Sequence, residues 1–210
     1  MSEGFTYETG KTIKRETYEW DNLWWEHSND TEGKERILII GDSISCGYRS
    51  IINQELQGKI YADGLGTSKS IDNENLLKVI EYFMMQQENY KLILFNSGLH
   101  GWHLSAEEYK ENYLTYVKYF KEKHADKKLV LVLTTPVRKN TDLSQLEERN
   151  AQVILRNQAV LEIAESEAVP VVDLYSLLID HPEYCSPDGV HQTQEGYKVL
   201  AKELVKVIGV

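Results

Sequence analysis

The chain has 210 residues, 41% of them hydrophobic, which is enough for one domain with a substantial core. Acidic residues outnumber basic ones by 33 to 23 and give a formal charge of -10, so the surface should repel nucleic-acid phosphates and anionic lipid headgroups. Because the N-terminus lacks a secretory signal pattern and no apolar stretch approaches the roughly 20 residues that span a bilayer, we expect a soluble, cytoplasmic protein with neither nucleic acid nor membrane as partner.

Residues 1–35 come first in the chain and do not follow the pattern of the rest. They contain the stretch YEWDNLWWEH, with three of the four tryptophans, and then the polar stretch SNDTEGKE. We interpret them as an N-terminal arm that packs its aromatic side chains on the domain or on a second subunit, which would make a homo-oligomer. A sugar-stacking platform is the alternative.

From residue 36 onward, short aliphatic runs alternate with amphipathic stretches of helical length. The runs predict buried strands at 36–40, 59–62, 91–95, 128–133 and 169–174. The stretches between them predict helices at about 48–56, 73–88, 105–123, 144–166 and 193–208. This alternation predicts an α/β fold, in which one parallel sheet of about five strands is covered by helices on both faces and joined by right-handed crossovers.

Polar loops follow each predicted strand. In chain order they read GDSIS, DGLGTS, NSGLHGWH, TTPVRKN and YCSPDGVH. The carboxyl ends of parallel strands meet at one edge of the sheet, where ligands bind. We therefore expect these loops to form one site, although polar loops alone do not identify its chemistry.

The chemistry is indicated by the spacing of Asp188 and His191, three residues apart across a glycine. A tight turn there can place the carboxylate against the imidazole, which fixes the tautomer and leaves one ring nitrogen to accept a proton. Ser43, at a strand-to-helix turn, supplies a nucleophile beside helix-start amides. The three residues together predict a catalytic triad.

Each part of this triad has a competing interpretation. Ser43 could be a helix N-cap, and the DGVH stretch could be a structural turn. Ser45 and Cys46 are rival nucleophiles, but both should lie deeper in the helix. Cys46 and Cys185 are the only cysteines, and we expect free thiols.

The stretches GDSIS at 41–45 and DGVH at 188–191 resemble the first and last blocks of the SGNH, or GDSL-type, esterases and acylhydrolases. The similarity runs from about residue 36 to the C-terminus, so residues 36–210 would be the hydrolase domain. It implies a flavodoxin-like three-layer α/β/α fold and ester hydrolysis by a serine nucleophile, with no metal and no cofactor. The family's oxyanion donors carry over to the Ser43 amide and to the amide of Gly66, with Gly64 as the other register.

The third block departs from the family, because His100 occupies the position of the usual asparagine. A neutral imidazole can donate one N–H to an oxyanion, so His100 is a reasonable replacement. Asn96, two residues before Gly98, could reach inward instead. The sequence does not decide between them.

The sequence constrains the substrate less than it constrains the reaction. Many relatives deacetylate carbohydrates, so we expect a short acyl group, acetyl above all, on a saccharide or another small ester. Trp102 could stack on a sugar ring or simply pack, and Arg138 could bind a substrate carboxylate or phosphate. The alternatives are a metal-dependent hydrolase, suggested by His100 and His103, and a binding module that has lost turnover.

Overall fold

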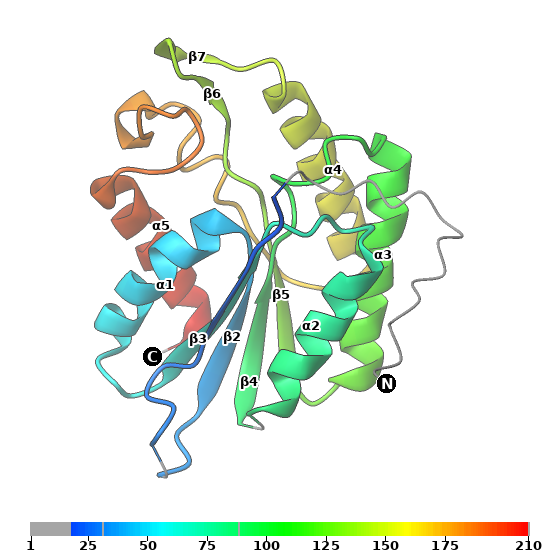
Figure 1. Ribbon diagram of the computed structural model, residues 1–210, viewed down its shortest axis with the longest axis vertical. Coiled ribbons are helices and arrows are strands. Elements are labelled where there is room, and N and C mark those ends of the chain that lie inside the picture. The colour runs from blue at the N-terminus through cyan, green and yellow to red at the C-terminus, as the bar shows by residue number, and fades with distance from the viewer. Residues whose placement is uncertain (1–17, 31, 88, 210) are drawn as a thin grey trace, which may run out of the picture.

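Helices cover both faces of one central sheet in the computed structural model, which describes residues 18–30, 32–87 and 89–209 (Figure 1). The strand order is β1-β3-β2-β4-β5-β8, and every neighbouring pair except β1 and β3 runs parallel. The strands are β1 (Asp21–Trp24), β2 (Arg36–Gly41), β3 (Tyr61–Thr67), β4 (Tyr90–Phe95), β5 (Lys128–Val132) and β8 (Val171–Val172). The helices are α1 (Ser43–Leu56), α2 (Glu74–Met85), α3 (Ala106–Lys123), α4 (Asn150–Glu167), a 3-10 helix η1 (Pro182–Tyr184) and α5 (Gln194–Ile208).

The side chains of β2 show why the fold has three layers. Successive residues of a strand point to opposite faces, and every residue of β2 is buried. Ile37 and Ile39 belong to the core cluster that includes residues of α1 and α5, whereas Leu38 and Ile40 belong to the cluster that includes residues of α2 and α3. The predicted three-layer α/β/α arrangement is therefore confirmed, with a six-stranded mixed sheet in place of about five parallel strands.

Two predicted boundaries shift near the start of the domain. The second strand, expected at 59–62, runs from Tyr61 through Thr67, because β1 and β2 pair with it on both sides despite its glycines. The first helix starts at Ser43, five residues before the expected position, because the Asp42 side chain accepts the amide hydrogen of Ile44 and caps it.

Further shifts occur in the second half of the chain. Residues expected at the start of the 144–166 helix instead belong to a ribbon of β6 (Arg138–Lys139) and β7 (Asp142–Leu146), and α4 begins at Asn150. The ribbon projects beyond the sheet at the top of Figure 1. The last predicted strand is reduced to the two residues of β8.

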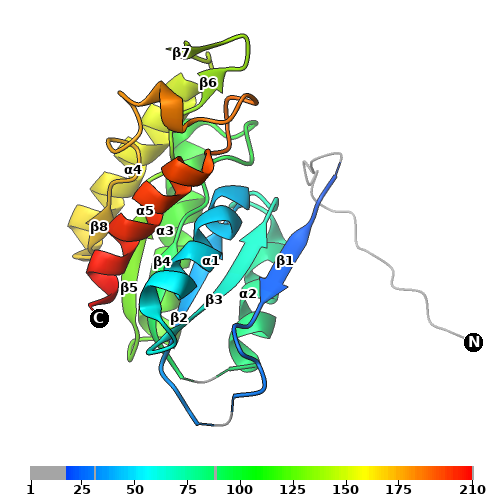
Figure 2. The ribbon, with the colours of Figure 1, turned by 90° about the vertical axis from the view of Figure 1, so that its left-hand side faces the viewer.

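The described part of the N-terminal arm packs on the domain, which is one of the two expected arrangements. Its strand β1 adds antiparallel to the edge strand β3, as Figure 2 shows, and Trp25 stacks on Phe83 with ring centroids 4.4 Å apart. Residues 1–17 of the arm lie outside the described residues. The division at residue 35 and an oligomer formed through the arm stay predictions.

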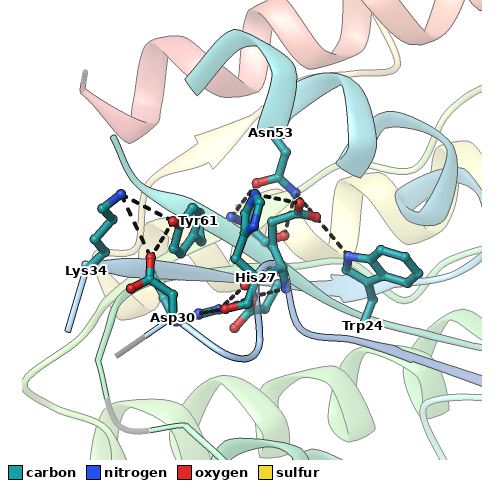
Figure 3. Close-up of polar contacts among 10 residues, drawn as sticks. Trp24, His27, Asp30, Lys34, Asn53 and Tyr61 are labelled. Atoms are coloured by element: carbon teal, nitrogen blue, oxygen red, sulfur yellow. Dashed lines mark hydrogen bonds and ion pairs between the residues drawn. The ribbon is translucent and has the colours of Figure 1, made fainter. Parts of the chain in front are cut away.

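A buried ion pair between Arg36 and Asp63 holds the arm at the amino ends of the strands, and Figure 3 shows the contacts of Asp30, Lys34 and Tyr61 in the same region. Arg36 Nη1 donates to Asp63 Oδ1 at 2.7 Å and to the Glu26 carbonyl at 2.9 Å, and the Glu26 amide donates to the same Asp63 oxygen at 2.8 Å. The Tyr61 hydroxyl donates to Asp30 at 2.5 Å. The partners of the buried Asp63 carboxylate come from the arm and the sheet, so this carboxylate ties the arm to the sheet.

Helices α1 and α5 lie side by side on one face of the sheet (Figures 1 and 2). Gly47 allows this close approach, since a Cβ built there would lie 2.2 Å from the Tyr197 ring. The packing brings the residues before α5 next to the start of α1, although they are far apart in sequence. Within the described ranges, none of the helices is long and apolar enough to cross a bilayer.

Candidate active site

Ser43 is the first residue of α1, at the carboxyl end of the buried strand β2. Asp42, not Ser43, is the N-cap, so the hydroxyl of Ser43 is not used for capping. The first amides of a helix have no partner within the helix, which leaves the Ser43 amide available as a donor. The turn therefore presents both the hydroxyl and the amide of Ser43 at the carboxyl edge of the sheet.

The loop before α5 turns sharply and brings Asp188 against His191. Gly189 adopts a left-handed conformation (φ +79°), and a Cβ there would lie 2.1 Å from the Arg138 carbonyl oxygen, so only glycine fits. Asp188 Oδ1 accepts the amides of Val190 and His191, both at 2.9 Å. The turn that the DGVH stretch predicts is therefore present, and it orients the carboxylate.

Ser43, His191 and Asp188 form one hydrogen-bonded chain. Ser43 Oγ lies 2.8 Å from His191 Nε2, and His191 Nδ1 lies 2.7 Å from Asp188 Oδ2. A carboxylate can only accept, so Nδ1 carries the hydrogen and Nε2 can accept the serine proton. The His191 side chain is 44% exposed, which leaves the ring open to a substrate. The arrangement is able to generate a serine nucleophile.

The pKa of the Asp188 carboxyl lies below its usual range. Partial burial raises it, but the amide of Val190 and both the ring and the amide of His191 donate hydrogen bonds that outweigh burial. The carboxylate therefore stays charged opposite the imidazole at and below neutral pH.

The two rival nucleophiles are occupied elsewhere. Ser45 Oγ is buried and donates to the Asp42 carbonyl at 2.6 Å. Cys46 faces Gly66, and burial raises the pKa of its thiol, which keeps it protonated and weakly nucleophilic. Cys46 and Cys185 are both free, as expected.

Of the two candidate oxyanion glycines, Gly66 lies at the carboxyl edge beside the site. It pairs with Gly41 in the sheet register, and a Cβ built on it would lie 3.4 Å from the Asp42 carbonyl oxygen and 2.2 Å from Cys46 Sγ. Gly64 pairs two residues lower, with Ile39, under the Arg49 side chain. The placement favours the Gly66 register.

The two candidate third donors lie differently. The Asn96 amide nitrogen donates to the Val132 carbonyl at 2.8 Å and to Thr134 Oγ1 at 3.1 Å, so both of its hydrogens are used within the sheet edge. The His100 ring makes an edge contact with Trp20, at 6.4 Å between centroids, and lines the recess beside Asp42. Asn96 therefore has no amide hydrogen left to give to an oxyanion.

Both predicted substrate contacts outside this region have structural roles. Arg138 is buried, and its guanidinium donates to the carbonyls of Leu143, Leu178 and Ile179 at 2.6–3.0 Å. Trp102 packs with its ring 4.7 Å from the Arg156 guanidinium carbon. Packing, the alternative for Trp102, accounts for the position of its ring. The Arg138 guanidinium is directed at backbone carbonyls and not at a substrate.

Trp20 is a site residue that the sequence reasoning missed. Its ring lies 3.5 Å from a Cβ built on Gly66 and contacts His100, so the arm provides a wall of the candidate oxyanion region. The main chain of Trp20 is held by Ser68, whose amide donates to the Trp20 carbonyl at 3.1 Å. The cluster of tryptophans in the sequence pointed to this segment. The pairing of β1 with β3, which places Trp20 beside the site, could not be predicted from the sequence.

The recesses beside Asp42, the residue before Ser43, are small. One recess of about 10 Å³ lies between β2, β3 and the third-block loop, lined by residues that include Asp42, Thr67 and His100. A larger hollow, about 710 Å³, is lined by arm residues 23–25 and 27–30 near the opposite end of the sheet. A recess of about 10 Å³ accommodates a group no larger than about one water molecule.

The carboxyl of Asp42 is buried beside the site, and its pKa is shifted. Burial raises the pKa of its carboxyl, and the nearby His100 and His191 oppose this only in part. Within the described residues, Asp42 Oδ2 and Thr135 Oγ1 are buried without a hydrogen-bond partner, and both residues line a second small cavity.

We expect the substitution Asp42→Asn to raise the free energy of unfolding more at pH 7 than at pH 4. A carboxyl whose folded pKa is raised stabilises the fold most where it is protonated, below about pH 3.9, and loses that contribution as pH rises. Asparagine keeps the oxygen that caps Ile44 and carries no charge. Thermal unfolding at the two pH values measures the effect, and an equal change at both would contradict it.

The chain belongs to the GDSL-like lipase/acylhydrolase family, whose profile matches residues 39–199. It is 28% identical over 141 residues to the GDSL esterase/lipase WDL1 of Oryza sativa subsp. japonica, and 23% identical over 190 residues to the isoamyl acetate-hydrolyzing esterase of Schizosaccharomyces pombe. These matches cover 62% and 82% of this chain, but 52% and 74% of the relatives, so the chain spans about half the length of the rice protein.

A solved structure supports the fold. The acetylxylan esterase Axe2 from Geobacillus stearothermophilus superposes with a TM-score of 0.66 at 18% identity, covering 84% of this chain and 94% of that one. The family resemblance drawn from the two sequence blocks is thus confirmed.

Proposed function

We propose that this protein is a serine esterase that hydrolyses short-chain acyl esters, acetyl esters above all, on a carbohydrate or another small substrate. The observation that carries the proposal is the chain of hydrogen bonds from Ser43 through His191 to Asp188. Family membership supports ester hydrolysis as the chemistry.

In the proposed mechanism, His191 Nε2 takes the proton of Ser43 Oγ while the oxygen attacks the ester carbonyl. The amides of Ser43 and Gly66 and the His100 imidazole stabilise the oxyanion. His191 then gives its proton to the leaving alcohol, and a water molecule, deprotonated by the same ring, releases the acyl group from the serine.

A short acyl group is favoured by the similar proteins. Two of the similar proteins are named for acetyl ester hydrolysis, on isoamyl acetate and on acetylxylan. We infer that an acetyl group is preferred over longer acyl groups.

The direct test is turnover of p-nitrophenyl esters of increasing chain length and of acetylated xylan. We expect the highest kcat/KM with the acetyl ester and no loss on addition of a chelator. Loss with the chelator would favour a metal-dependent hydrolase, for which the described residues contain no group of three potential ligands. Inertness toward all esters would favour a binding module.

We also expect kcat/KM to fall on the acid side of neutrality, because a charged imidazole cannot accept the serine proton. The lowered pKa of Asp188 keeps its carboxylate ionised over this range. The stability that depends on ionised Asp188 is lost only as pH falls through that lowered pKa, so the fold should persist at pH 5. A flat profile from pH 5 to 8 would contradict the role of His191.

A further inference from the structure

A buried guanidinium holds the loop that carries His100. Arg156, on α4, is only 2% exposed. Its Nη1 donates to the carbonyls of Gly98 at 2.7 Å and His100 at 2.8 Å, and its Nη2 donates to the carbonyl of Gly101 at 2.6 Å. One side chain thus binds three of the four residues of the third block.

The surroundings of Arg156 suit its hydrogen bonds to the loop carbonyls and not an ion pair. Its guanidinium carbon lies 4.7 Å from the centre of the Trp102 ring and 5.0 Å from that of Tyr109, distances at which a cation is attracted to an aromatic face. In the described part of the chain Arg156 forms no salt bridge. Burying an unpaired charge is costly, and the carbonyls of one short loop are what offset that cost.

The loop is also confined on its other sides. A Cβ built on Gly98 would lie 1.7 Å from Thr134 Oγ1, so Gly98 packs directly on the end of β5. Gly101 has a left-handed backbone (φ +71°) and packs on Ser70, whose neighbour Asp72 accepts from the His103 ring at 2.8 Å. With the backbone fixed on both sides of His100, the clamp sets the point from which the His100 side chain leaves the main chain.

We propose that Arg156 is a positioning residue for ester hydrolysis, which fixes the backbone of residues 98–101 so that the His100 imidazole faces the developing oxyanion. This inference rests on the proposed function. The planar fork of arginine can reach three carbonyls at once, whereas the single ammonium of lysine cannot match that geometry. Displacing a catalytic group by about 1 Å can cost roughly 100-fold in rate.

A double-mutant cycle with p-nitrophenyl acetate separates positioning from general support of the fold. We expect Arg156→Lys to lower kcat about tenfold to 100-fold with KM unchanged within about twofold. In a His100→Ala background the same substitution should lower kcat by less than about threefold, because the group that it positions is already absent. Arg149→Ala is the matched control, since Arg149 also lies near Trp102, at 5.7 Å, but is exposed and, within the described residues, bonds no carbonyl of the loop.

Equal losses in the two backgrounds, or an unchanged kcat with native His100, would overturn the assignment. Arg156→Gln, which is similar in length and uncharged, closes the same cycle if the lysine variant does not fold, and thermal unfolding identifies the folded variants. The two proposals fail separately. A wild-type protein without ester turnover contradicts the proposed function, whereas normal wild-type turnover with additive losses contradicts only the role of Arg156.

Discussion

The substitution Ser43→Ala should lower kcat for ester hydrolysis by roughly 10⁴- to 10⁶-fold, because it removes the oxygen that forms the acyl bond. The fold should be unaffected, since Asp42 caps α1 and, among the described residues, the Ser43 hydroxyl bonds only His191. Steady-state kinetics with p-nitrophenyl acetate, together with thermal unfolding, measure both effects.

Ser45→Ala is the matched control, two residues further along the same helix. Its hydroxyl donates to the Asp42 carbonyl, so its loss should cost about 1 kcal/mol of stability while turnover is retained. Residual activity near the wild-type level in Ser43→Ala, or its loss in a folded Ser45→Ala variant, would mean that the nucleophile is misassigned.

The second large effect is expected from Asp188→Asn, which should lower kcat about 10⁴-fold without disturbing the turn. The asparagine oxygen can still accept the amides of Val190 and His191. Its amide nitrogen, however, would donate to Nδ1 of the ring and place the ring hydrogen on Nε2. The imidazole then presents a donor to Ser43 and cannot take its proton.

Asp173→Asn provides the control for this change. Asp173 also closes a turn to the residue three positions on, by accepting the Ser176 amide at 2.9 Å, and within the described residues its side chain bonds Ser176 and no member of the triad. Its replacement should leave kcat unchanged. A loss smaller than tenfold in Asp188→Asn would show that Asp188 does not set the tautomer.

The sequence was sufficient to place the two halves of the site together. Ser43 and His191 are 148 positions apart, but both follow the carboxyl edge of the sheet, where a repeated strand-helix order brings loops together. The turn at Gly189 was readable because its residues act locally. A short motif and one topological rule decide the positions of these residues.

The positions of the arm and of Arg138 and Arg156 could not be predicted from the sequence in the same way. The addition of β1 to β3 depends on which sheet edge is free, and this is a property of the finished fold. Arg138 suggested a ligand contact, yet it binds backbone carbonyls from 143, 178 and 179, which approach it only after folding. Local patterns therefore identified the candidate reacting groups but not the side chains that support them.

The central claim is that Ser43 is the nucleophile activated by His191, and covalent labelling with a fluorophosphonate tests it most directly. We expect mass-spectrometric mapping to find one adduct, on the peptide containing Ser43, at a rate that falls as the imidazole is protonated. The Ser43→Ala variant should stay unlabelled. An adduct on Ser45, on Cys46 or on any residue outside that turn, or no adduct on a folded and active protein, would contradict the account.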